Sequence, residues 1–231
     1  YKAVWTSAEQ EMGFYYLAAL SAQKREYAEA LEFVERSLVK NSRNLKSRGL
    51  KAYLLNRLDK QLQADEFLQQ SIQQDPFDYV SRFEAYGVED AQTLGLMRNN
   101  PNTFISAAVC YAEYGCEEKA AAILGQYDGE QPMVAYYLAY YAAQCGDEKT
   151  CKQALAKAEN GNPLYCFPNK LTDIPVLSWA VAAAPQDGMA AYYLGNLWYD
   201  KRQYEVATAL WEKAANLKPE FPTVWRNLAL A

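Results

Sequence analysis

A repeating pattern with a period of 34 residues constrains this chain more than any other feature of its sequence. Its clearest copy lies near the C-terminus and consists of Leu194-Gly195, Trp198, Tyr204, Ala207, Trp211, Ala214 and Pro219. Residues of the same kinds return at matching spacings in four earlier segments, which begin near residues 11, 45, 101 and 132. A period of about 20 to 50 residues is typical of stacked supersecondary units, each of which packs on its neighbours.

The residue types at these positions indicate pairs of antiparallel helices. Two helices approach closely only where their side chains are small, so Gly195 and Ala207 mark the contact between the first and the second helix of one unit. Trp198 and Trp211 fill the space beside that contact. Pro219 cannot continue a helix and forces the turn into the next unit. The pattern therefore predicts a tandem array of helix pairs.

This spacing resembles the tetratricopeptide repeat (TPR) family, and the resemblance covers most of the chain. It implies an all-α fold, a TPR-like α-solenoid in which antiparallel helix pairs form a right-handed superhelix with two irregular inserts. We expect one continuous solenoid domain. Its parts are the end of a preceding helix (1–10), two repeats (11–78), an irregular insert (79–100), two repeats (101–165), a half-repeat insert (166–187), one repeat (188–221) and the truncated first helix of a further repeat (222–231).

Two stretches interrupt the period and define the inserts. Residues 79–100 begin with a helical pattern and then reach Gly87, Gly95 and an Asn-Asn-Pro breaker. Residues 166–187 contain one apolar helix that ends at Pro185. Insertions of this kind carry binding contacts in many repeat proteins.

The two ends of the chain indicate a piece of a longer protein. The chain starts at Tyr1, without an initiator methionine or a signal-peptide pattern. At the other end, the helix that carries Trp225 and Leu228 lacks the second helix of its repeat. Because terminal repeats normally present a polar outer face, we expect more chain or another molecule to cover this helix.

The segment from 163 to 231 also resembles the repeat region of large bacterial proteins in which a β-rich domain of unknown function precedes the repeats. The residues that carry this resemblance are Phe167-Pro168, the runs 175–180, 193–197 and 199–201, and Trp225-Arg226-Asn227-Leu228. The resemblance implies a carbohydrate-related role for the parent protein. These 231 residues do not contain the β-rich domain, so no activity of that domain is carried over.

The residue types needed for common catalytic sites are missing. The chain has no histidine, which removes imidazole-dependent nucleophile systems, and it has no phosphate-binding glycine loop. The five cysteines, which include no C-x-x-C motif, are Cys110, Cys116, Cys145, Cys151 and Cys166. We expect reduced thiols packed in helices, with a redox switch between Cys145 and Cys151 as the alternative. The prediction is a protein that is not an enzyme and has no catalytic residue, metal site or cofactor.

Charge and hydropathy exclude two further classes of partner. The formal net charge is −5, and no run of Lys and Arg is longer than two residues, which disfavours nucleic-acid binding. The longest apolar run, residues 133–143, is about half the length of the roughly twenty residues that a membrane helix needs. We expect a cytoplasmic protein with neither a nucleic-acid nor a membrane partner.

In the TPR family, the first helices of successive repeats line a concave face. Their second, fifth, ninth, twelfth and thirteenth residues point inward, and this register implies a groove rich in tyrosine and amide side chains. The candidate partner-binding residues are Tyr15, Tyr53, Asn56, Arg57, Tyr136, Tyr140, Tyr192, Asn196 and Tyr199. Tyrosine combines a flat apolar ring with a polar tip, which suits a binding surface. Packing between adjacent first helices is the competing interpretation of these tyrosines.

The leading hypothesis is a protein–protein interaction scaffold whose groove holds a peptide or a neighbouring domain. An N-terminal region of its own parent protein is one candidate for that domain. Lys46, Asn56 and Arg57 supply part of a clamp for a C-terminal carboxylate. Tyr15 and Ala19, however, stand where that clamp needs polar groups, so we expect an extended peptide instead. The alternative is an accessory glycan-binding module of a carbohydrate-related bacterial protein.

Overall fold

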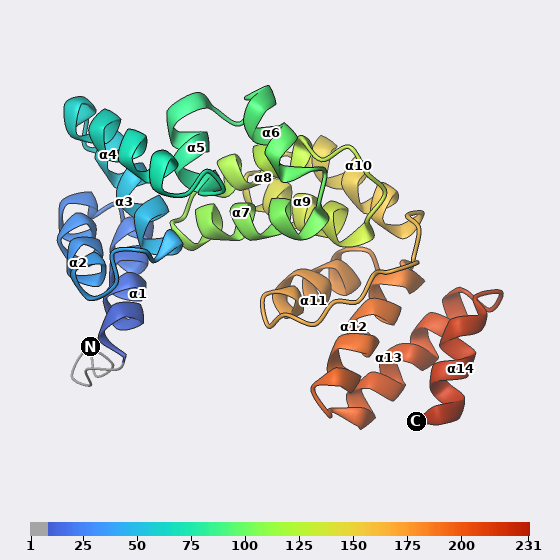
Figure 1. Cartoon of the computed structure of the whole chain (residues 1–231). Coiled ribbons are helices and arrows are strands. Elements are labelled where there is room, and N and C mark those ends of the chain that lie inside the picture. The colour runs from blue at the N-terminus through green and yellow to red at the C-terminus, as the bar shows by residue number, and fades with distance from the viewer. Residues whose placement is uncertain (1–8) are drawn as a thin grey trace. The chain divides into compact units, whose positions relative to one another are not determined.

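The computed structural model describes residues 9–231, and Figure 1 shows that this part of the chain is built from helices, most of them joined by short turns. Residues 9–231 contain fourteen helices and no strand. The all-α prediction is therefore confirmed, and the helices follow one another as the antiparallel pairs of a TPR-like α-solenoid. Of the preceding helix expected at 1–10, residues 1–8 lie outside the described residues.

The described residues form two compact units, one up to Gln126 and one from Tyr127 onward. The first unit contains α1 (Gln10–Gln23), α2 (Tyr27–Lys40), α3 (Leu45–Arg57), α4 (Gln61–Gln74), α5 (Tyr79–Tyr86), α6 (Ala91–Met97), α7 (Pro101–Glu113) and α8 (Glu117–Gly125). The second contains α9 (Pro132–Gln144), α10 (Glu148–Glu159), α11 (Asp173–Ala183), α12 (Gly188–Asp200), α13 (Tyr204–Leu217) and α14 (Pro222–Leu230).

The turn inside each full helix pair contains a residue in the left-handed backbone region. These residues are Arg25, Asp59, Gly115, Gly146 and Arg202, with φ between 53° and 75°. A left-handed residue just after a helix lets the chain reverse while the last carbonyls of the helix are still hydrogen-bonded. Glycine adopts this conformation without strain, whereas the arginines and the aspartate adopt it at some cost. The same short turn therefore recurs with different residues.

Small residues line the contact between the helices of a pair. Ala18, Ala30, Ala52, Ala64, Ala108, Ala120, Ala139 and Ala207 have no exposed surface. Gly195 lies against Trp211, and Gly49 lies against Val80 in the neighbouring helix α5. These positions are too tight for a larger side chain, which explains the small residues of the 34-residue pattern.

Residues 79–100, expected as an insert, contain the two short helices α5 and α6. Each begins at an aspartate whose side chain accepts a backbone N–H: Asp78 from Ser81 at 3.1 Å and Asp90 from Thr93 at 2.8 Å. Such caps satisfy one of the free donors at a helix start. In the segment 166–187, expected as a half-repeat, the one complete helix is α11, which follows an irregular stretch.

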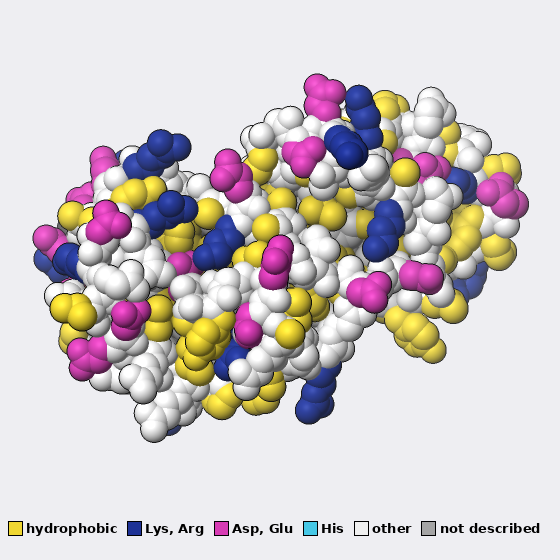
Figure 2. All heavy atoms as spheres, turned by 90° about the horizontal axis from the view of Figure 1, so that it is seen from above, with side chains coloured by type: hydrophobic (Ala, Val, Ile, Leu, Met, Phe, Trp, Pro, Cys, Tyr) yellow, Lys and Arg dark blue, Asp and Glu magenta, His cyan; other side chains and the backbone are white. Residues whose placement is uncertain are grey.

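The surface shows no concentration of one charge on the face that Figure 2 presents, where Lys and Arg side chains are interspersed with Asp and Glu. None of the helices in residues 9–231 combines the length and the apolar character needed to cross a bilayer. The same residues hold no cluster of three or more Cys, Asp or Glu side chains arranged to bind a metal ion.

Candidate partner-binding site

In the first unit, the predicted groove residue Tyr15 is covered by the protein's own side chains. Tyr15 is fully buried and its hydroxyl donates to a carboxylate oxygen of Glu113, at the end of α7. Lys46 on α3 lies 2.9 and 3.0 Å from the two Glu113 carboxylate oxygens. Gln23 on α1 donates to the backbone carbonyl of Glu113 at 3.1 Å. The end of α7 therefore bonds to both α1 and α3.

Tyr53 lies in an aromatic cluster beside this network. It is 3% exposed, and its ring centroid lies 5.5 Å from that of Tyr114 and 6.3 Å from that of Tyr111. Burial raises the pKa of Tyr15 and of Tyr53, so both hydroxyls stay protonated. The structure thus places Tyr15 and Tyr53 in the interior, because α7 occupies the space that an open groove would leave.

The side chains of Asn56 and Arg57 differ in how far contacts within the protein occupy them. Asn56 donates to Glu84 at 2.8 Å, and this buried carboxylate also accepts from Tyr111 at 2.7 Å and from Lys119 at 2.6 Å. Arg57 is exposed, with its guanidinium 5.0 Å from the centre of the Tyr53 ring. Of the two, Arg57 presents the more accessible side chain.

In the second unit, Tyr136 is also interior. It has no exposed surface, and its hydroxyl donates to Asp187 at 2.8 Å. Asp187 in turn accepts the backbone N–H groups of Met189 and Ala190 and so caps the start of α12. Tyr140 is half-buried, with its ring centroid 5.6 Å from that of Trp179. The structure gives these two tyrosines packing partners on α11 and at the start of α12.

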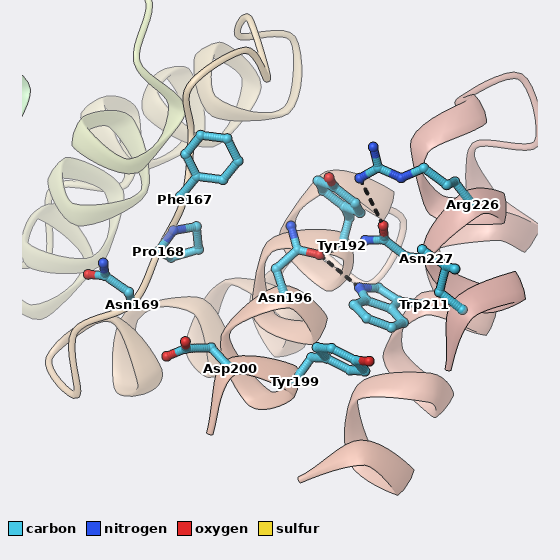
Figure 3. Close-up of a pocket in the computed structure, with 11 residues that line it drawn as sticks. Phe167, Pro168, Asn169, Tyr192, Asn196, Tyr199, Asp200, Trp211, Arg226 and Asn227 are labelled. Carbon is cyan, nitrogen blue, oxygen red and sulfur yellow. Dashed lines mark hydrogen bonds between the residues drawn. The ribbon is translucent and has the colours of Figure 1, made fainter. Parts of the chain in front are cut away.

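The last three predicted residues line one pocket of about 390 Å³ (Figure 3). Tyr192, Asn196 and Tyr199 are four and three residues apart on α12, a spacing that puts them on one face of a helix. The full lining consists of Phe167, Pro168, Asn169, Tyr192, Asn196, Tyr199, Asp200, Trp211, Arg226, Asn227 and Leu230. This pocket lies entirely within the second unit and is the candidate site.

The amide of Asn196 is held in one orientation. Its Oδ1 accepts from Trp211 Nε1 at 3.0 Å and from Asn227 Nδ2 at 3.0 Å. Because an indole N–H can only donate, the oxygen of Asn196 has to face Trp211. The Nδ2 group then points away from Trp211, as Figure 3 shows. The pocket therefore contains an amide donor group with a fixed direction.

Aromatic rings surround this amide. Tyr192 is mostly buried and its ring centroid lies 4.9 Å from that of Phe221. Tyr199 is 37% exposed, with its ring centroid 5.1 Å from that of Trp211 and 5.0 Å from that of Tyr204. Packing on fixed neighbours restricts the tyrosine rings, so little further entropy is lost when a ligand contacts them.

The segment before α11 forms the opposite wall and is tied down by polar contacts. The backbone N–H groups of Asn169 and Lys170 donate to Asp173 at 3.0 and 2.9 Å, and Lys201 donates to the Asn169 carbonyl at 2.8 Å. Phe167 nevertheless stays 75% exposed. An anchored loop thus presents an exposed aromatic side chain beside the pocket.

The sequence register missed part of this lining. Counting the family positions from residue 222 would have found Arg226 and Leu230, which are the fifth and ninth residues of that helix. Trp211 belongs to the repeat pattern, which predicts a packing role for it and no role in the pocket. No register exists for Phe167, because it lies in an irregular segment.

These features define a helical-repeat protein with a small aromatic and amide-lined pocket. No protein-family model matches the chain. Similar solved structures include TTC0263, a thermophilic TPR protein of Thermus thermophilus (15% identity, 95% of this chain and 97% of that chain covered, TM-score 0.32). YrrB, described as a TPR protein with an unusual peptide-binding site, is 13% identical over 98% of this chain and 95% of its own, with a TM-score of 0.30. MamA is 10% identical over 94% of this chain and 96% of its own, with a TM-score of 0.29. Function is therefore inferred from the pocket itself.

Proposed function

We propose that this chain is a protein-binding module that holds an extended peptide segment in the pocket of its second unit. The observation that carries the proposal is the amide of Asn196, which Trp211 and Asn227 hold at 3.0 Å each so that its Nδ2 group stays available. A peptide carbonyl is the natural acceptor for such a donor. A donor whose direction is already fixed loses little entropy on binding.

The remaining lining suits one side chain of the peptide. Phe167 and Tyr199 both expose ring surface beside the amide, and the pocket volume of about 390 Å³ lies at the small end of the usual range for ligand sites. An apolar side chain that enters between these rings would be removed from water on two sides. Burial of apolar surface then supplies affinity, while Asn196 supplies direction.

The lining also favours binding over catalysis. Among the described residues, Asp200 is the one carboxylate that lines the pocket, and it is paired with Lys201 at 2.8 Å. The same lining includes no second acid, and no cysteine or serine to act as a nucleophile. We therefore assign a non-enzymatic role to this site, with Tyr192, Asn196 and Tyr199 as contact residues.

The test is selection of a phage-displayed random peptide library on the immobilised chain, followed by binding measurements with Phe167→Ala. Phe167 is 75% exposed, so its truncation should leave the fold intact while it removes part of the pocket wall. We expect affinity for the selected peptides to fall about three- to ten-fold, which corresponds to roughly 1 kcal/mol of lost apolar contact.

Leu171→Ala is the matched control, because Leu171 is 71% exposed in the same segment and does not line the pocket. Equal effects of the two substitutions, or none, would contradict the proposal. A glycan array probed with the same variants tests the accessory glycan-binding role suggested by the resemblance of residues 163–231. Glycan binding that depends on Phe167, together with an empty peptide selection, would replace the peptide with a sugar.

A further inference from the structure

Within residues 9–231, the charges around the pocket leave one cation without an acidic partner. The carboxylate of Asp200 lies 2.8 Å from Lys201 Nζ, so these two charges offset each other. Arg226, on α14, has a neutral partner instead: its Nη2 donates to the side-chain oxygen of Asn227 at 3.2 Å. In the described part of the chain, no Asp or Glu forms an ion pair with Arg226. The lining therefore carries an unmatched positive charge.

A chain of hydrogen bonds fixes the place of this guanidinium. Trp211 can only donate, so Asn196 accepts from it through Oδ1 and accepts from the Asn227 Nδ2 group at the same atom. The Asn227 Oδ1 atom is then left to accept from Arg226. Figure 3 shows the guanidinium turned toward this oxygen at the edge of the pocket. The remaining N–H groups of Arg226 are available to a ligand.

We propose that the peptide bound in this pocket carries an acidic side chain, Asp or Glu, next to the apolar side chain that enters between the rings. This inference rests on the proposed function and adds the charge of the ligand to it. A planar guanidinium matches the two oxygens of a carboxylate, and a hydrogen bond between charged groups is stronger than one between neutral groups. The peptide carboxylate pairs with Arg226 while the Asn196 amide holds a backbone carbonyl.

The local charge is distinct from the charge of the whole chain. A formal net charge of −5 disfavours acidic peptides at long range, so any preference for them has to come from a nearby cation. Because Arg226 is exposed, solvent screens the pair. We therefore expect a glutamate-containing peptide to bind only about two- to five-fold more tightly than its glutamine counterpart.

The experiment uses an array of nonapeptides blocked at both ends, so that side chains are the only source of carboxylate. Each peptide has a central Leu, Phe, Tyr or Trp followed by Glu, Gln or Lys. The array is probed with the wild type, Phe167→Ala, Arg226→Gln and Lys157→Gln. Lys157 is exposed in the same unit and does not line the pocket, so its substitution changes the net charge equally. Far-UV circular dichroism checks that each variant is folded.

We expect the two- to five-fold preference for Glu over Gln in the wild type and in Lys157→Gln, and its loss in Arg226→Gln. Peptides that bind through Phe167 without any preference for Glu would overturn this inference while leaving the proposed function intact. A preference that persists in Arg226→Gln would also overturn it. If no peptide binds in a way that depends on Phe167, the proposed function itself fails.

Discussion

The close approach of α12 and α13 predicts the effect of a single added methyl group. A Cβ atom on Gly195 would lie 2.5 Å from Trp211 Cδ1, 2.6 Å from Trp211 Nε1 and 3.2 Å from the Ala207 carbonyl oxygen. The first two distances are well inside van der Waals contact. Trp211 is 3% exposed and packs against Tyr199, so its ring has little room to move. Gly195→Ala therefore has to push the two helices apart.

The size of the effect follows from two opposing contributions. Overpacking of a close contact costs about 1 to 3 kcal/mol, and a rigid ring beside a backbone oxygen belongs in the upper part of that range. Replacing glycine by alanine inside a helix regains up to about 1 kcal/mol. We expect the free energy of unfolding to fall by about 1 to 2 kcal/mol, which lowers the melting temperature by several degrees.

Thermal unfolding followed by far-UV circular dichroism measures this change, and Gly95→Ala is the control. Gly95 lies inside α6, and a Cβ atom there would meet nothing within 4 Å. This variant should be as stable as the wild type or more stable. If Gly195→Ala proves as stable as Gly95→Ala, the close helix contact is not what restricts position 195, and the packing argument is refuted.

Three further predictions concern charge and thiols. Glu113→Gln removes the charge that Lys46 contacts at 2.9 Å, while the amide oxygen of the new side chain can still accept from Tyr15. Since Lys46 is 39% exposed, solvent screening limits the loss to about 0.5 to 1 kcal/mol in urea unfolding, and an unchanged midpoint would show that the Lys46 pair contributes nothing. Burial raises the pKa of Asp187 above the ordinary aspartate value of 3.8. The stability that the protonated carboxyl contributes is therefore full below pH 3.8 and is lost as the pH rises from there through the raised pKa; the stability of the wild type relative to Asp187→Asn should fall over that range, and parallel pH profiles would argue against it. Cys145 is exposed, whereas burial raises the pKa of the Cys166 thiol to about 12. A thiol reagent at about pH 8 should therefore label Cys145 in the native protein and Cys166 only on unfolding. Rapid labelling of Cys166 in the native protein would disagree with its burial.

The helix pairs could be predicted from the sequence because their determinants are local. Gly195 and Ala207 are both part of one 34-residue unit, and the structure places both in the interior. Pro219 follows the end of α13 at Leu217, where a proline cannot extend the helix. When residues contact partners within one or two turns of the same helix, or in the adjacent helix, their residue types recur at regular spacings in the sequence.

The environment of the predicted groove residues could not be predicted, because it depends on distant parts of the chain. Tyr15 meets Glu113, 98 residues away, and Tyr136 meets Asp187, 51 residues away. The register indicates the helix face from which a side chain projects, but it does not indicate which part of the chain will pack against that face. Tyr136 and Tyr192 occupy the same register position, yet Tyr136 is buried with a carboxylate partner and Tyr192 lines a pocket.

The same limit explains why the pocket depends on a residue that the pattern assigns to packing. Trp211 fills the space beside Gly195, and its ring N–H sets the direction of the Asn196 amide at 3.0 Å. A leucine at this position could fill much of the space, but it could not orient an amide. One residue therefore couples the spacing of α12 and α13 to the polar geometry of the pocket, and through Asn227 to the position of the Arg226 charge. Changes that loosen this helix pair should alter ligand binding even when they lie outside the pocket lining.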